Sequence, residues 1–173
     1  MKFREWVVVA ASACLLATTP ASTQEKPVTG CHDARSRHFD FWIGEWQVTE
    51  GGKAAGVNRI ESILDGCALL ENWTGGSGFS GKSLNHFDRA DGRWHQLWID
   101  GSGGVLSLAG GFANGAMRLE GSTLATPKQP AQRHRITWTP HADGTVRQLW
   151  EAAPTGKNEW KVQFDGLYLR PSR

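Results

Sequence analysis

Two segments of the chain repeat almost the same nine residues, and each places a glutamine between bulky side chains. Residues 90–98 read A-D-G-R-W-H-Q-L-W and residues 142–150 read A-D-G-T-V-R-Q-L-W, identical at six of nine positions. The Asp-Gly pair is typical of a tight hairpin turn, and an alternating strand follows it. On one face of each strand, Gln96 and Gln148 lie between apolar neighbours. Because a buried amide without partners costs free energy, this choice favours a ligand cavity over a plain core.

Alternation assigns further aromatic and polar side chains to the same inward faces. The predicted ligand-binding residues are Trp73, Asn85, Trp94, Gln96, Trp98, Gln148 and Trp150. A few polar groups among rings are typical of small-ligand sites, and they suit an aromatic, heterocyclic or sugar-like ligand. The alternative is that the tryptophans fill a core and that the polar side chains satisfy one another or trapped water.

Two carboxylates, Glu71 and Asp100, share these faces and are the candidate catalytic groups. An inward carboxyl group in an aromatic cavity has a shifted pKa and can act as an acid or a base. The sequence therefore favours a binding protein, with a cofactor-independent isomerase, lyase, hydratase or cyclase as the alternative. We expect no cofactor. We also expect no metal, because the six histidines show no ligand-like spacing.

Glycine-containing turns recur every eight to twelve residues after position 40, and no segment between them shows a helical apolar period. This pattern predicts an all-β fold, a single antiparallel up-and-down β-barrel of about ten strands with room for one small ligand. The one long connection, 124–132, is expected to be a loop at the barrel rim. The strands are predicted at 45–50, 56–64, 67–74, 82–88, 93–100, 104–110, 116–123, 133–139, 145–152 and 159–169.

The chain begins with a basic start, an uncharged apolar stretch and small residues, which predict a signal peptide over 1–23. The apolar stretch is too short to span a bilayer comfortably, so no membrane span is expected. A flexible leader is predicted over 24–38 and the barrel domain over 39–173. Across the boundary between the two, 33–41 is expected to form a short helix that plugs one end of the barrel. The protein is expected to be periplasmic or secreted.

Cysteine content and charge narrow the expected chemistry and partners. Cys31 and Cys67 are the two cysteines beyond the signal peptide, and in an oxidising compartment such a pair is expected to form a disulfide. The formal net charge of +2 provides no basic excess, so no nucleic acid partner is expected. A third interpretation is an interaction module or homodimer, with Leu97, Ile99 and Leu149 on the outer surface.

The start of the predicted domain, F-D-F-W-I-G-E-W over 39–46, resembles the lipocalin and calycin signature through Gly44 and Trp46. This resemblance implies that Trp46 closes the barrel base and stacks against a cation near the chain end, for which Arg170 is the candidate. The whole mature chain resembles a family of secreted bacterial calycin-like domains of unknown function. That family supplies an expected fold and location but no catalytic residues. The matching segments are 39–46, 65–73, 81–85, 94–100, 135–140 and 143–151.

Overall fold

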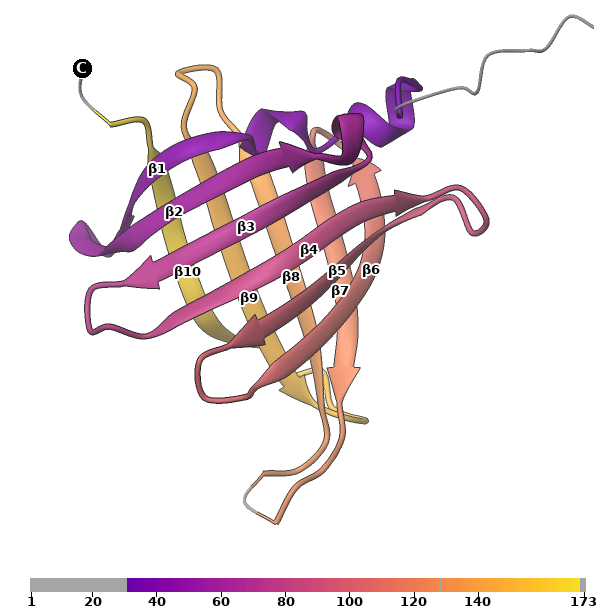
Figure 1. The fold of residues 1–173 in the computed structure, drawn as a ribbon. Coiled ribbons are helices and arrows are strands. Elements are labelled where there is room, and N and C mark those ends of the chain that lie inside the picture. The colour runs from indigo at the N-terminus through magenta and orange to yellow at the C-terminus, as the bar shows by residue number, and fades with distance from the viewer. Residues whose placement is uncertain (1–30, 128, 172–173) are drawn as a thin grey trace, which may run out of the picture.

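The computed structural model describes residues 31–127 and 129–171. Ten antiparallel strands form one closed barrel in which each strand pairs with its sequence neighbours and β1 pairs with β10 (Figure 1). The predicted up-and-down barrel is confirmed. The strands are β1 Gly44–Glu50, β2 Lys53–Ile63, β3 Ala68–Gly75, β4 Ser80–Asp88, β5 Arg93–Asp100, β6 Val105–Ala113, β7 Ala116–Thr123, β8 Gln132–Pro140, β9 Val146–Pro154 and β10 Lys161–Leu169.

The two repeated segments form the same kind of turn and then strands β5 and β9. In the first, Asp91 Oδ1 accepts a hydrogen bond from the backbone N–H two residues later, at 2.9 Å. In the second, Asp143 Oδ1 accepts the equivalent bond at 2.9 Å. Gly92 and Gly144 follow with φ of 70° and 82°. The carboxylate and the left-handed glycine together fix the turn, which explains why both strands begin in the same register relative to their glutamine.

Two short 3₁₀ helices, η1 Ala34–Arg37 and η2 Asp40–Trp42, lie across one end of the barrel, and the loop between β7 and β8 projects from the opposite end (Figure 1). A third, η3 Leu64–Gly66, connects β2 to β3. Asp33 caps η1, because its Oδ1 accepts the backbone N–H groups of Arg35 and Ser36 at 3.1 Å each.

The short helix expected over 33–41 is present as η1 and η2, and η1 forms the last part of the predicted leader, 24–38. The capping aspartate and the nearby disulfide hold this stretch in place. The predicted signal peptide, 1–23, and the leader up to residue 30 lie outside the described residues.

The helical segment fills its end of the barrel with aromatic rings. Phe39 and Trp42 are both fully buried and stack on each other, with ring centroids 4.9 Å apart. The Trp138 ring from β8 lies 5.1 Å from Phe39 and 5.3 Å from Trp42, and the Trp94 ring from β5 meets Phe39 edge-on at 5.6 Å. These residues, here called the plug cluster, close one end of the barrel by close packing of rings.

The predicted Cys31–Cys67 disulfide is confirmed. The two Cα atoms lie 4.8 Å apart, within the usual range for a disulfide. Cys67 follows η3 and precedes β3, so the bond attaches the start of the helical segment to the β2–β3 connection.

The contact expected between Trp46 and Arg170 is present at the same end of the barrel. The guanidinium carbon of Arg170 lies 3.6 Å from the centroid of the Trp46 ring, in the geometry of a cation–π contact. Arg170 Nη1 also donates to the carbonyl oxygen of Ile43 at 3.0 Å, and Trp46 Nε1 donates to the carbonyl oxygen of Trp42 at 2.8 Å.

Gly44 is required where Arg170 crosses the backbone. Its φ is 128°, and a Cβ atom at this position would lie 2.0 Å from Arg170 Nη1. We therefore expect Gly44→Ala to lower the free energy of unfolding by about 1–3 kcal/mol, because it adds backbone strain and displaces the guanidinium. Urea denaturation measures the loss. Gly111→Ala is the matched control, since a Cβ at Gly111 meets no atom within 4 Å. Equal stability of the two variants would contradict the prediction.

Candidate functional site

A cavity of about 250 Å³ lies inside the barrel, toward the end away from the plug cluster. The two ends of β5 show this arrangement, because its first inward ring, Trp94, belongs to the plug cluster while Trp98 and Asp100 line the cavity. Most of the predicted site residues meet here. Those in the lining are Glu71, Trp73, Gln96, Trp98, Asp100, Gln148 and Trp150.

Two of the expected ligand-binding residues, Trp94 and Asn85, are not in this lining. Trp94 belongs to the plug cluster, where its indole Nε1 donates to the carbonyl oxygen of Arg35 at 2.9 Å. Asn85 is fully buried in the wall, and its Oδ1 accepts a hydrogen bond from Gln96 Nε2 at 2.9 Å. Alternation placed both on the correct face, but it carries no information on how deep along the barrel a side chain lies.

The lining also contains side chains that sequence reasoning did not select. They come from the β3–β4 turn, β6, β8 and β10, and they are Phe79, Leu106, Ile136, Gln163, Phe164 and Tyr168. Alternation along β10, where Phe164, Gly166 and Tyr168 occupy every second position, is the signal that could have identified two of them. An irregularity in the pairing of β10 with β9, between Val162 and Phe164, obscures that signal at the start of the strand.

Glu71 is the centre of a buried hydrogen-bond network, and one arm of this network ends at Gln148. The side chain of Glu71 is 4% exposed. Asn58 Nδ2 donates to Glu71 Oε1 at 2.7 Å and to the hydroxyl oxygen of Tyr168 at 3.2 Å. The Tyr168 hydroxyl in turn donates to Gln148 Oε1. This arm connects β3, β2, β10 and β9 across the closure of the barrel.

The second arm ends at the other repeated glutamine, Gln96. Ser83 Oγ donates to Glu71 Oε2 at 2.5 Å, and Asn85 Nδ2 donates to Ser83 Oγ at 2.8 Å. Gln96 Nε2 donates to Asn85 Oδ1 at 2.9 Å and approaches Ser83 Oγ at 3.3 Å. The repeated glutamines are thus the two ends of one network centred on Glu71.

The network uses only half of each terminal amide. Gln96 is held through Nε2, and Gln148 is held through Oε1. Gln96 Oε1 and Gln148 Nε2 have no hydrogen-bond partner among the residues that the structure describes. Since both residues line the cavity, Gln96 presents an acceptor there and Gln148 presents N–H donors.

Burial raises the pKa of Glu71 to about 7, against the opposing effect of the hydrogen bonds from Ser83 and Asn58. Desolvation penalises the charged carboxylate, so this group changes protonation state near neutral pH. Burial also raises the pKa of the Tyr168 hydroxyl, with the Glu71 charge adding to the effect. Tyr168 is therefore neutral, and it serves the network as a hydroxyl donor and acceptor.

Asp100 has the opposite electrostatic character. Its Oδ1 accepts hydrogen bonds from the Ser102 hydroxyl at 2.5 Å, the Ser102 N–H at 2.8 Å and the Gly104 N–H at 2.9 Å. The Ser102 hydroxyl and the Gly104 N–H are the main causes that hold the pKa of this carboxyl below its usual value. Asp100 is therefore ionised at the rim of the cavity, at the end of β5.

Aromatic rings of the lining lie against inward-facing glycines, either of the neighbouring strand or, for Phe164, of the same strand. A Cβ atom at Gly81 would lie 2.2–2.9 Å from three atoms of the Trp98 ring, and one at Gly166 would lie 2.4 and 2.5 Å from two atoms of Phe164. The Trp73 ring reaches within 2.9 Å of the Cβ position of Gly56. The missing side chains let these rings lie along the wall, which leaves space in the middle of the barrel.

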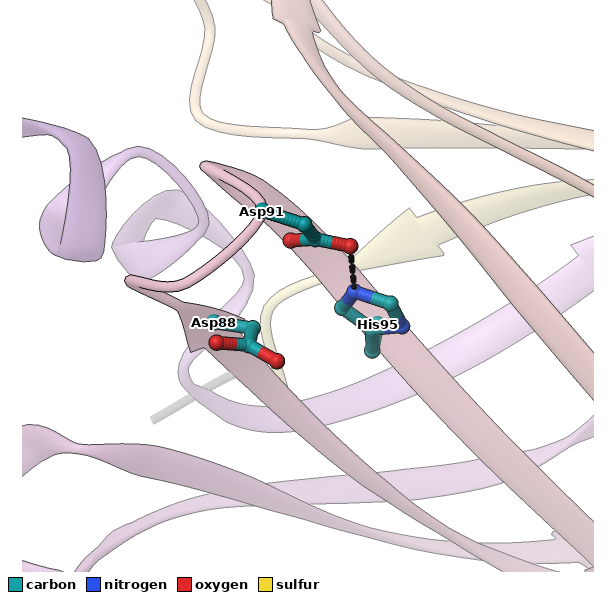
Figure 2. A group of neighbouring side chains, drawn as sticks. All are labelled: Asp88, Asp91 and His95. Carbon is teal, nitrogen blue, oxygen red and sulfur yellow. Dashed lines mark hydrogen bonds and ion pairs between the residues drawn. The ribbon is translucent and has the colours of Figure 1, made fainter.

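One group outside the cavity has the composition of a metal site. Asp88, Asp91 and His95, around the turn between β4 and β5, offer ligand atoms that lie within 4.8 Å of one another (Figure 2). Asp91 Oδ2 already pairs with His95 Nε2 at 2.8 Å, and Asp88 Oδ1 accepts the N–H of Ala90 at 2.7 Å. These bonds account for the arrangement as turn chemistry.

The outer residues predicted for a partner surface lie on two sides of the barrel. Leu97 and Ile99 on β5 are 43% and 49% exposed, whereas Leu149 on β9 is half-buried. The homodimer stays a prediction. Within 31–127 and 129–171, no helix has the length and apolar character needed to cross a membrane.

Comparison of the chain with protein-family models finds no match, and comparison with curated proteins finds none either.

Proposed function

We propose that this protein binds a small cyclic ligand, aromatic, heterocyclic or sugar-like, in the cavity of its barrel. The observation that supports this most directly is the pair of half-used amides. Gln96 Oε1 and Gln148 Nε2 face a cavity whose walls are aromatic rings, and a ligand with a donor and an acceptor would complete both.

The size of the cavity bounds the ligand. Its volume of about 250 Å³ corresponds to roughly eight water molecules at about 30 Å³ each. Sites for drug-sized ligands begin at about 300 Å³. The cavity therefore suits a molecule of one or two rings.

The two ends of the barrel differ in a way that favours binding over simple packing. At the plugged end, Phe39, Trp42 and Trp138 fill the interior with rings in direct contact. At the other end, rings such as Trp98 lie against glycines and the interior stays open. A sequence selected only for a dense core would fill both ends in the same way.

The calycin-like family and the secreted or periplasmic location belong to the same proposal. The base built from Gly44, Trp46 and Arg170 and the Cys31–Cys67 disulfide support them. A disulfide is typical of proteins that reach an oxidising compartment.

A second candidate function is acid–base catalysis by Glu71. A pKa of about 7 suits a carboxyl group that donates or accepts a proton at neutral pH, and Glu71 lines the cavity. A cofactor-independent isomerase or lyase would use it as the acid or base, with Gln96 and Gln148 orienting the substrate. Glu71→Gln tests the second function, because it abolishes turnover in an enzyme that uses this carboxyl group, whereas a carrier has no turnover to lose.

The proposed function predicts a retained ligand that depends on the repeated glutamines. Native mass spectrometry of protein purified from its own cells is expected to show a bound small molecule. Gln96→Leu and Gln148→Leu should each weaken its binding by about 1–3 kcal/mol, because a polar group of the ligand loses its partner. Calorimetric titration with the identified molecule measures the loss.

The matched control is Gln47→Leu, the same change at an exposed position of β1. The contacts also set the expected stability. Gln96→Leu leaves the buried Asn85 Oδ1 without its hydrogen-bond donor, so this variant should be less stable than wild type. If the Gln96 amide made no such bond, the substitution would be expected to leave the stability unchanged. Binding that is unaffected by both inward variants would contradict the proposed function.

A further inference from the structure

The cavity has carboxyl groups but no cationic side chain to receive an anion. Glu71 and Asp100 are its acidic residues, and none of the described residues in its lining is Lys, Arg or His. An anionic ligand would face Asp100, which is ionised, and would lose its hydration without a counter-charge. The lining therefore disfavours carboxylates, phosphates and sulfates.

The aromatic lining is suited to positive charge because of how the rings lie. Trp98 covers Gly81, and Phe164 covers Gly166. Three consecutive atoms of the Trp98 ring lie 2.2–2.9 Å from the Cβ position of Gly81, so one face of this ring rests on the wall and the other face is turned away from it. Trp73 packs edge-on to Phe164, with centroids 5.9 Å apart and planes at 76°, so rings in two orientations border the same space. The faces of aromatic rings attract cations, and cages of this kind recognise ammonium groups.

We propose that the ligand is an organic cation, an amine or ammonium compound with a body of one or two rings, held by the faces of Trp73, Trp98 and Phe164 and by the carboxyl groups of Glu71 and Asp100. This proposal rests on the proposed function and specifies the charge of the ligand. The unpaired Gln96 Oε1 accepts an N–H of the ligand, which a protonated amine supplies.

A series of one-ring compounds with similar shape and different charge tests the proposal. The compounds are phenethylamine, 2-phenylethanol and phenylacetate, which share the same ring and two-carbon or one-carbon arm and differ in the charge of the end group. Calorimetric titration at pH 8 is expected to show phenethylamine binding at least about tenfold more tightly than 2-phenylethanol, and no detectable binding of phenylacetate. Equal or tighter binding of 2-phenylethanol or phenylacetate, or no binding of any of the three, overturns the proposal.

Variants of the two carboxyl groups give a second readout. Glu71→Gln and Asp100→Asn should each weaken phenethylamine binding at least about fivefold and leave 2-phenylethanol binding within about twofold. Gly81→Ala should weaken both compounds together, because the added methyl group displaces the Trp98 ring, whereas the control Gly111→Ala should weaken neither. A similar loss for both compounds in the carboxyl variants would overturn the charge assignment.

The pH dependence has a defined sign. An alkyl amine stays protonated up to about pH 10, as lysine does. Glu71 becomes ionised as the pH rises through about 7, so phenethylamine affinity should increase from pH 6 to pH 8 in wild type and stay flat in Glu71→Gln. Two other titratable groups face this space. Asp100 stays ionised over that range and Tyr168 stays neutral. His134, which accepts the indole N–H of Trp150 at 3.2 Å, has its pKa lowered by burial, which favours its neutral form.

The mass of the retained molecule separates failure of this proposal from failure of the proposed function. A retained amine supports both. A retained neutral or acidic molecule overturns the cation proposal and leaves the proposed function standing. A protein that carries no molecule from its own cells and binds none of the three compounds overturns both.

Discussion

Trp42→Ala is expected to lower the free energy of unfolding by about 3–5 kcal/mol, the usual cost of removing a large buried aromatic side chain. Trp42 is fully buried and stacks on Phe39 at 4.9 Å. It also contacts Trp138 at 5.3 Å and Tyr168 at 6.3 Å. Its removal leaves a void among rings that other strands hold in place. Urea denaturation followed by circular dichroism measures the loss.

Trp160→Ala is the control, because Trp160 is half-buried on the outside of the barrel and meets Arg133 and Arg135 at 5.0 and 4.1 Å. Loss of these cation–π contacts should cost about 1 kcal/mol. Trp42→Phe should cost less than Trp42→Ala, since it keeps a ring and removes an indole N–H that is buried without a partner. If Trp42→Ala cost no more than Trp160→Ala, the plug cluster would not be part of the stabilising core.

The barrel itself was predictable because its signals are local. Turn residues such as Asp91-Gly92 and Asp143-Gly144 act over two or three positions, and alternation determines the face of each strand. Ten closely spaced strands with short turns leave few topologies other than a meander. The closing contact between β1 and β10 joins residues far apart in sequence, and the pairing of Trp46 with Arg170 there came from a resemblance and not from any local pattern.

The site was predictable only in part, because alternation determines a face but not a depth. Trp94 and Trp98 share a face of β5, yet Trp94 belongs to the plug cluster and Trp98 lines the cavity. The network around Glu71 was out of reach for a different reason. Asn58 and Tyr168 come from β2 and β10, and only closure of the barrel brings them within 3.2 Å of each other. Each looks like an ordinary strand residue in the sequence.

Burial of Glu71 should make the protein less stable as the pH rises from about 4.5 to about 7. The carboxyl pKa is about 7 in the folded state against an ordinary value of 4.5, so between these values the folded state holds a proton that the unfolded state has lost. Stability falls with pH wherever the folded state binds more protons. At about 1.4 kcal/mol for each pH unit, the loss is about 3 kcal/mol and is complete above pH 7. Urea denaturation at half-unit pH steps measures it.

Glu71→Gln isolates this contribution, because the amide has nearly the same shape and does not titrate. The Ser83 hydroxyl can rotate to accept from the new amide group, while Asn58 Nδ2 keeps an oxygen acceptor. The variant should therefore match wild type near pH 5 and exceed its stability by about 2–4 kcal/mol at pH 8. Taking the difference between the two proteins cancels His134, whose lowered pKa acts in the opposite direction below pH 6.5. A constant difference across the pH range would mean that Glu71 titrates normally, and the network would then hold an ordinary carboxylate with no capacity for proton exchange at neutral pH.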